Sequence, residues 1–245
     1  PDAPDGLSAA HVRLRTMQLA LEGTRTSVRA GQEAPFFSPQ SPSSLSSTAY
    51  PAFAGAGNIW AWTPQVYVEH RFEPSSMSTV AVRAGVLDPL TGELPRSEYS
   101  RLANAGERSR MPATAGHIGV RRGSEERAAS AGAGGYFARQ DWAYHRNTNA
   151  WAATADWDVP VSSRIRLSGE AYTGVAIGGL GGGANSSVLF DGDPAAETST
   201  VVPLQSHGGW AQVKLKPTPR IEFNVAYGLD RSTPHHAQGL LEAPN

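Results

Sequence analysis

The chain has 245 residues, a net charge of -1 and no cysteine. A near-neutral chain gives no electrostatic reason to expect a nucleic-acid partner, and the lack of cysteine excludes disulfides, thiolate metal sites and cysteine nucleophiles. No stretch approaches the roughly 20 consecutive apolar residues that a membrane helix needs. The length suits one large β domain, and we expect a single domain over residues 1–245.

The strongest pattern is an alternation of apolar and polar residues that returns along most of the chain. In its clearest copy, one face carries Trp60, Trp62, Pro64, Val66, Val68, His70 and Phe72. The opposite face carries Thr63, Gln65, Tyr67, Glu69 and Arg71. An apolar face backed by a charged face indicates a sheet with lipid on one side and water on the other.

We predict ten strands from this alternation. They cover residues 12–22, 26–32, 59–72, 77–86, 114–122, 129–142, 150–159, 163–177, 208–216 and 220–229. A helical turn is expected within 97–105, as a loop decoration.

The connections between these strands differ in length. Short polar turns join the two members of each pair, whereas most pairs are separated by the long segments 33–57, 87–113 and 178–207. Short turns at one end and long loops at the other are typical of outer-membrane barrels. The predicted fold class is therefore all-β: an antiparallel up-and-down meander of about ten strands. It would form a transmembrane β-barrel, or a large part of one, with short periplasmic turns and long extracellular loops.

Five segments carry a resemblance to a known family. They are residues 27–39, 85–89, 134–142, 168–172 and 208–217. Together they resemble porin-like outer-membrane β-barrel proteins of Gram-negative bacteria. The resemblance implies an outer-membrane location, contact with membrane lipid, passive passage of small hydrophilic solutes and assembly into homotrimers, with no catalytic residues. Such barrels usually end in a strand that closes on an aromatic residue. Because this sequence does not, we expect it to be a fragment of a longer chain that has a signal peptide and further terminal strands.

If the barrel prediction holds, the polar face is the functional surface. The predicted pore-lining residues are Arg71, Arg83, Arg121, Arg139, Asp156, Asp158, Arg164, Arg166, Glu170, Tyr172, Lys214 and Glu222. With Arg29, Lys216, Arg220, Glu69 and Asp141 added, this face carries ten cationic and six anionic side chains. That excess predicts a mildly anion-tolerant pore, since charge rings set pore selectivity. The alternative is that these charges pair across strands and only solvate the lumen.

Aromatic residues near the predicted strand ends suggest interfacial girdles, although the core of a soluble sandwich is the alternative. They are Trp60, Trp62, Phe72, Trp142, Trp151, Trp157, Phe223 and Tyr227. The glycine-rich run 178–183 lacks the Lys-Ser/Thr of a phosphate loop, and the similar run 132–135 begins a strand. We expect 178–207 or 33–57 to fold inward and narrow the pore.

Two other functions stay open. The first is a soluble, secreted all-β binding module of the carbohydrate-binding type. The second is an outer-membrane enzyme built on the same barrel, which would require Ser, His and Asp to converge on the lumen or rim. We predict no enzyme activity, cofactor or metal, because the sequence has no recognisable catalytic set and no Gly-x-Ser-x-Gly elbow.

Overall fold

A computed structural model of the chain describes residues 15–44, 50–93, 102–124 and 127–235. The described residues form one antiparallel sheet whose neighbours follow the order β1-β2-β3-β4-β5-β6-β7-β8-β10-β11, with β9 added to β10. The strands are β1 (Met17–Glu22), β2 (Thr26–Glu33), β3 (Thr63–Ser75), β4 (Ser78–Leu87), β5 (Ala113–Arg122), β6 (Ala129–Asp141), β7 (Asn147–Pro160), β8 (Ile165–Val175), β9 (Val188–Phe190), β10 (Val201–Thr218) and β11 (Ile221–Pro234).

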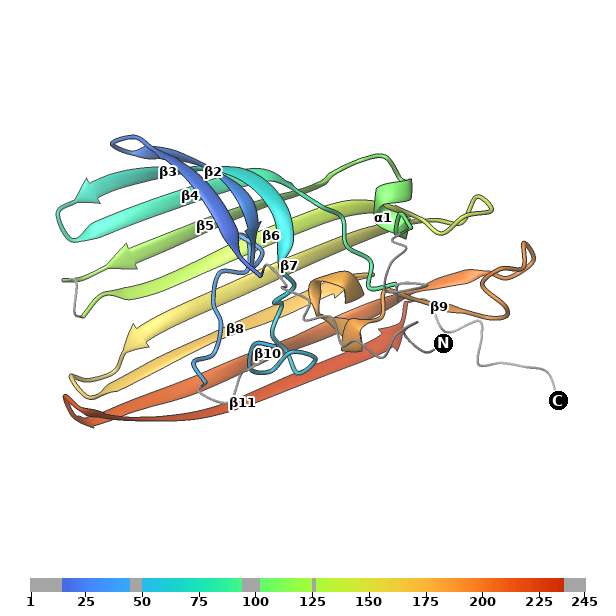
Figure 1. Cartoon of the computed structure of the whole chain (residues 1–245). Coiled ribbons are helices and arrows are strands. Elements are labelled where there is room, and N and C mark those ends of the chain that lie inside the picture. The colour runs from blue at the N-terminus through green and yellow to red at the C-terminus, as the bar shows by residue number, and fades with distance from the viewer. Residues whose placement is uncertain (1–14, 45–49, 94–101, 125–126, 236–245) are drawn as a thin grey trace, which may run out of the picture.

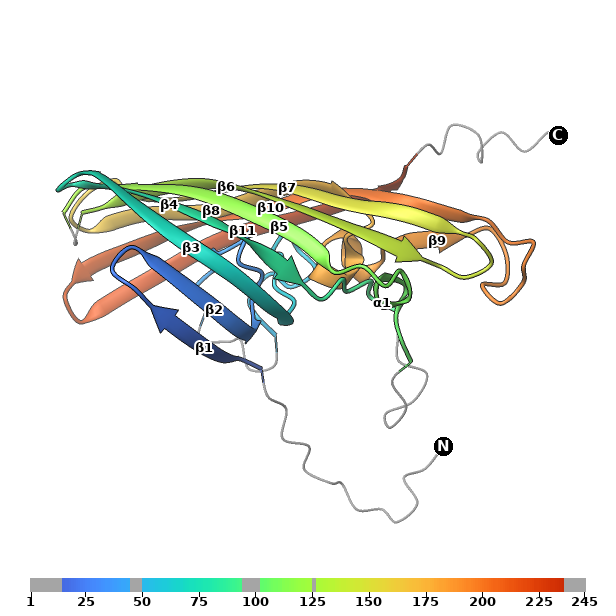
Figure 2. The same ribbon diagram turned by 90° about the horizontal axis from the view of Figure 1, so that it is seen from above.

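The sheet is strongly curved and does not close on itself in the described part of the chain, with β1 and β11 at opposite edges (Figures 1 and 2). The predicted all-β antiparallel meander is confirmed. Each of the ten predicted strands has a counterpart in the structure, and the short β9 is the one addition. The first predicted strand began at residue 12, and its residues 12–14 lie outside the described ranges.

Burial follows the alternation in the sequence, but with apolar side chains outward. In β3 the side chains of Val66 and Val68 are exposed on the convex face, while those of Tyr67 and Glu69 are buried on the concave face. The same arrangement holds along β7, β8 and β10, and in β4 and β11 the valines Val82, Val86 and Val225 are also exposed. An exposed apolar face opposite a buried polar face is the arrangement of a sheet whose outer solvent is lipid.

The connections divide the sheet into two ends, as predicted. Tight turns join β1–β2, β3–β4, β5–β6, β7–β8 and β10–β11 at one end, on the left in Figure 1. At the other end lie the segments 34–62, 88–112 and 176–200, together with the shorter 142–146. We call these the turn end and the loop end.

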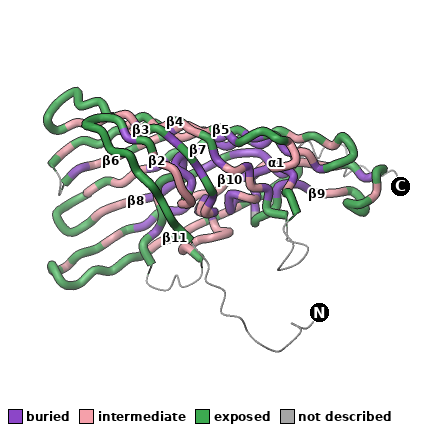
Figure 3. The backbone as a smooth tube through the Cα atoms, turned by 45° about the horizontal axis from the view of Figure 1, so that its top comes forward, coloured by how far each residue is buried: buried purple, intermediate pink, exposed green. Residues whose placement is uncertain are grey.

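Residues 34–43, 50–62 and 176–187 lie over the concave face (Figure 1), in the region where buried residues are concentrated (Figure 3), whereas residues 191–200 extend past the sheet at the loop end. Phe37, Ile59 and Leu180 from these segments form one buried cluster with Tyr136 and Tyr172 from the sheet. The glycine-rich run takes part, since it forms two 3-10 turns, η1 (Gly178–Leu180) and η2 (Gly183–Asn185). The buried core therefore lies between the sheet and its own loops.

One short α-helix, α1 (Ala105–Arg108), lies at the loop end and is capped by Asn104. The predicted helical turn covered 97–105; the helix begins where that range ends, because Asn104 accepts a hydrogen bond from the Glu107 N–H and Glu107 accepts one from the Asn104 N–H. Residues 97–101 lie outside the described ranges. Among the described residues, no helix is long and apolar enough to cross a membrane.

Candidate functional site

The first loop-end segment crosses the concave face as a strap, which we define as residues 34–43 and which makes one turn at residues 35–38. It leaves β2 and runs over the sheet towards β10 and β11 (Figure 1). Side chains from β3, β7, β8 and β10 hold it, in the same order as the strands lie in the sheet. The strap is thus fixed to the concave face along its whole length.

Two glutamines clamp the ends of the strap. The side-chain amide of Gln65 accepts a hydrogen bond from the Phe36 N–H (3.2 Å) and donates one to the Ala34 carbonyl (2.8 Å). The amide of Gln212 makes the same pair of bonds with Ser43 alone, at 3.0 Å from its N–H and 2.8 Å to its carbonyl. Each amide replaces a neighbouring strand, because it satisfies one N–H and one C=O of a backbone that would otherwise be buried unpaired.

The middle of the strap is held by Thr154 and Glu170. The Thr154 hydroxyl donates to the Phe37 carbonyl at 2.8 Å. The fully buried Glu170 carboxylate accepts hydrogen bonds from the Ser38 hydroxyl and, at 3.3 Å, from the Gln40 N–H. Buried carboxyl groups need such partners to offset the loss of water.

Between its two clamped ends the strap passes over β6. Gly134 on β6 lets the strap lie flat, since a Cβ there would lie 2.1 Å from the Phe37 carbonyl oxygen. This explains one glycine of the run 132–135 by close backbone approach.

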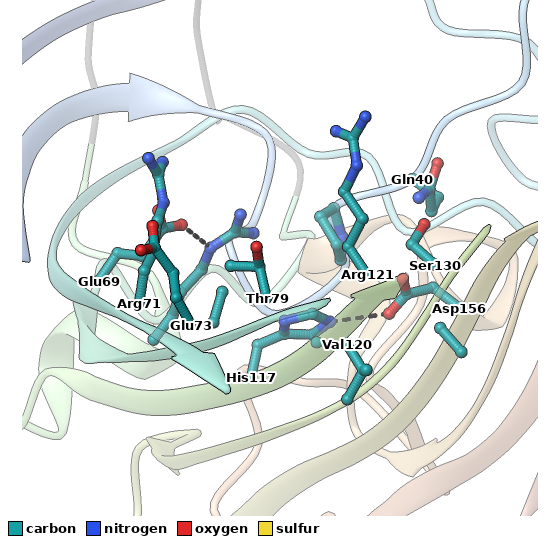
Figure 4. Close-up of a pocket in the computed structure, with 15 residues that line it drawn as sticks. Gln40, Glu69, Arg71, Glu73, Thr79, His117, Val120, Arg121, Ser130 and Asp156 are labelled. Carbon is teal, nitrogen blue, oxygen red and sulfur yellow. Dashed lines mark hydrogen bonds and ion pairs between the residues drawn. The ribbon is translucent and has the colours of Figure 1, made fainter. Parts of the chain in front are cut away.

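The strap forms one wall of a polar cavity of about 620 Å³ that extends towards the turn end, and we call it the strapped cavity (Figure 4). Pro39 and Gln40 belong to the strap. The sheet contributes Glu69, Arg71, Glu73, Thr79, Ala81, Arg83, His117, Gly119, Val120, Arg121, Ser130, Ala131 and Asp156. Glu69 is the hub of one charged group, because its two carboxylate oxygens bind Arg71 and Arg83, each at 2.6 Å.

A second pair of side chains in this cavity is His117 with Asp156. The Nε2 of His117 lies 2.8 Å from Oδ2 of Asp156, and both side chains are buried. Gly132 on the strand between them makes the contact possible, since a Cβ there would lie 2.5 Å from the His117 Nε2. Ser130 lines the same cavity, but the other ring nitrogen of His117 is buried without a hydrogen-bond partner among the described residues. The three residue types of a hydrolytic triad are therefore present without being joined into one.

A smaller cavity of about 330 Å³ lies at the turn end, and we call it the basic bowl. Its cationic lining residues are Arg127, Arg164, Arg166, Lys214 and Lys216. No carboxylate is among the described residues that line it. Three of these cations are paired with acidic side chains beside the bowl: Asp158 binds Arg166, and Glu222 binds Lys214 (3.2 Å) and Lys216 (3.1 Å).

The predicted pore-lining residues fall into four groups. Arg71, Arg83, Arg121 and Asp156 line the strapped cavity, and Arg164, Arg166 and Lys214 line the basic bowl. Asp158 and Glu222 are ion-pair partners of the bowl. Glu170 and Tyr172 are on the concave face but covered by the loop-end segments.

Arg139 is the exception, and its placement corrects the prediction. It shares the alternation of the exposed Phe137, opposite the buried Ala138 and Gln140, so it lies on the convex face. The predicted outward face of this strand was reversed, because Tyr136 and Ala138 pack inward under the strap. Trp142, predicted for a girdle, is also buried and donates its ring N–H to Gln140.

The other predicted girdle residues differ in exposure and in place. Phe72, Trp151, Phe223 and Tyr227 are exposed on the convex face. Trp157 is half-buried, and Trp60 and Trp62 precede β3, where their rings meet edge to face.

Apart from Glu170, the residues that hold the strap were not predicted as functional. The signal for them was present in Gln65 and Gln212, which are long uncharged polar residues at inward positions of the alternation. Thr154, His117 and Gly134 gave no such signal, since their partners lie on other strands or on the strap.

No family model matches this sequence, and no curated protein matches it. Among solved structures, the fold is similar to that of an outer membrane channel, DcaP of Acinetobacter baumannii, with a TM-score of 0.57 at 18% sequence identity. The match covers 85% of this chain and 56% of that one, so this chain spans little more than half the length of the channel. The chain thus has the fold of a porin-like outer-membrane barrel, as the resemblance in its sequence predicted.

Proposed function

We propose that the protein is the wall of an outer-membrane channel through which small hydrophilic solutes diffuse passively. The observation that carries this proposal is the strapped cavity itself. A charged concave face, partly covered by its own loops, stands opposite a convex face of exposed Val, Leu, Ile and aromatic side chains. The likeness to an outer membrane channel supports the same role.

The charges suggest where selectivity arises. The strapped cavity is balanced, with Arg71, Arg83 and Arg121 against Glu69, Glu73 and Asp156. The basic bowl is not, since its five cations face two nearby carboxylates. A mild tolerance for anions would therefore come from the turn end, which we assign to the periplasm because short turns lie there in outer-membrane barrels. Cross-strand pairing, the alternative weighed from the sequence, accounts for the charges around Glu69 and Glu222.

The rival functions have less support. A soluble binding module would expose a convex face rich in apolar side chains to water, which soluble monomers rarely do over a large area. An enzyme would need the Ser130, His117 and Asp156 side chains to be joined, and the free ring nitrogen of His117 is buried away from any hydroxyl partner in the described ranges. We therefore propose a non-catalytic channel, for which a trimeric assembly stays an expectation from the family resemblance.

The test is reconstitution of the full chain in planar lipid bilayers. The proposal expects extraction with detergent from outer membranes, heat-modifiable migration on gels and discrete conductance steps. Recovery of the folded chain from the soluble periplasmic fraction, without detergent and without conductance, would overturn it. Trimers would be detected by native mass spectrometry in the same detergent.

A further inference from the structure

We propose that Gln40 is the specificity-determining residue of the passage and that Glu170 is the positioning residue that holds it there. This inference rests on the proposed channel function and deepens it. It assigns a role in selectivity to an uncharged residue of the strap, in addition to the charges of the sheet face.

Gln40 reaches the strapped cavity from the strap side, into the same space as Arg121, Ser130 and Asp156 of the sheet (Figure 4). Its N–H donates a hydrogen bond to Glu170, which fixes the backbone position of a residue that lines the cavity. A solute that crosses the cavity passes between this amide and the charged wall of β5 to β7.

The backbone around Gln40 is stiff for local reasons as well. Pro39 and Pro42 flank it, and proline fixes φ near -65° while biasing the preceding residue towards extended conformations. Ser38 on one side and Ser43 on the other are themselves bound, to Glu170 and Gln212. The side chain at position 40 is thus presented to the cavity by a segment with little freedom to withdraw.

The charge balance of the cavity makes position 40 sensitive. Three arginines and three carboxylates cancel formally, so the neutral amide leaves the cavity without a strong preference for either sign. A single charge placed at this position tips that balance. At about 6 Å in water, one unit charge changes the local concentration of each monovalent ion about threefold.

The first experiment measures reversal potentials of the full chain in planar bilayers under a salt gradient. Gln40→Lys should shift the cation-to-anion permeability ratio towards anions by roughly threefold to tenfold, and Gln40→Glu should shift it towards cations by a similar factor. The matched control is Ser43→Lys, which adds the same charge to the same strap. Ser43 does not line the cavity, and its clamp to Gln212 uses only backbone atoms.

The second experiment tests the positioning role through coupling. Glu170→Ala removes both acceptors, so the strap centre is released and the effect of Gln40→Lys on the permeability ratio should fall to that of Ser43→Lys. Glu170→Gln keeps one acceptor oxygen and should restore part of the effect. A residue that only stabilised the fold would change the amount of folded protein and leave the shift caused by Gln40→Lys unchanged.

The outcomes separate this inference from the channel proposal. If the unmodified chain conducts, but both Gln40 variants have its reversal potential, the specificity role is wrong and the channel stands. If Gln40→Lys shifts the ratio equally with Glu170 and with Ala at position 170, the positioning role is wrong. If the folded, inserted chain shows no conductance at all, the channel proposal itself fails.

Discussion

The loop half and the turn half of the concave face use their polar residues in opposite ways. Near the loops, four polar residues are buried and form hydrogen bonds with the strap: Gln65, Thr154, Glu170 and Gln212. Near the turns, the side chains are charged, more exposed and paired mainly with each other. One sheet face thus holds a loop at one end and solvates a cavity at the other, and the strap is the boundary.

The largest expected effect comes from forcing the strap off the sheet. In Gly134→Ala, the new Cβ would lie 2.1 Å from the Phe37 carbonyl oxygen and 2.5 Å from the Thr154 hydroxyl, so the strap has to move. We expect a loss of about 2–3 kcal/mol in unfolding free energy and a larger single-channel conductance.

The neighbouring Gly135→Ala is the matched control, because the nearest atom to its added Cβ is 3.9 Å away. Urea unfolding and bilayer conductance measured on both variants decide the matter. Equal behaviour of the two variants would show that the strap does not rest on Gly134.

A smaller loss is expected when the loop-end segment 176–200 is released from the sheet. The Tyr172 hydroxyl donates to Asp230 (2.7 Å) and accepts the Gly183 N–H (3.2 Å), which joins β8, β11 and the turn η2. Tyr172→Phe leaves both partners unpaired and should lower the unfolding free energy by about 1–2 kcal/mol. The control is Tyr227→Phe, whose ring is exposed on the convex face. If Tyr172→Phe lowers the unfolding free energy no more than Tyr227→Phe does, this contact does not hold the loop.

These two contacts show where sequence reasoning reached its limit. The alternation of β8 placed Tyr172 and Glu170 on the concave face correctly, since the period of a strand is two residues and follows directly from the order of side chains. What covers that face depends on where a loop returns, and the strap joins residues more than a hundred positions apart in the chain. No local pattern encodes such a contact.

The reversed face of β6 has a similar physical origin. Its alternation is weak, because small residues occupy both faces from Ala129 to Gly135, so the face was predicted from Arg139 and Asp141, and the prediction was reversed. Two glycines of the run 132–135 make room for tertiary contacts: Gly134 for the strap, and Gly132 for the contact between His117 and Asp156. Their function is visible only once the neighbouring strands are in register.

At the turn end, the role of the basic bowl is tested by removing the charge of one carboxylate, Glu222. Glu222 binds Lys214 and Lys216, so Glu222→Gln frees two of the cations that line the basic bowl. We expect the permeability ratio to shift about twofold towards anions, with a smaller shift at high salt because the bowl is solvent-exposed. Glu22→Gln is the control, since Glu22 pairs with Arg29 on β1 and β2, at the opposite edge of the sheet from β10 and β11. An unchanged ratio at low salt would remove the bowl from the account of selectivity.

The smallest effect is expected at the outermost loop, where Asp191 accepts hydrogen bonds from the Thr200 hydroxyl (2.6 Å) and N–H (2.7 Å). These hydrogen bonds lower the pKa of Asp191 below its ordinary value of 3.8. A lowered pKa in the folded state means that the contact stabilises the loop above pH 3.8 and that this contribution is lost as the pH falls through the lowered value. Hydrogen exchange of residues 191–200 should therefore lose protection on acidification, and Thr200→Val should move that loss to higher pH, while Thr198→Val should not. Because the loop lies beyond the strap, conductance should stay constant through this transition. If the conductance changes over the same pH range as the loop, the strap does not separate this loop from the conducting path.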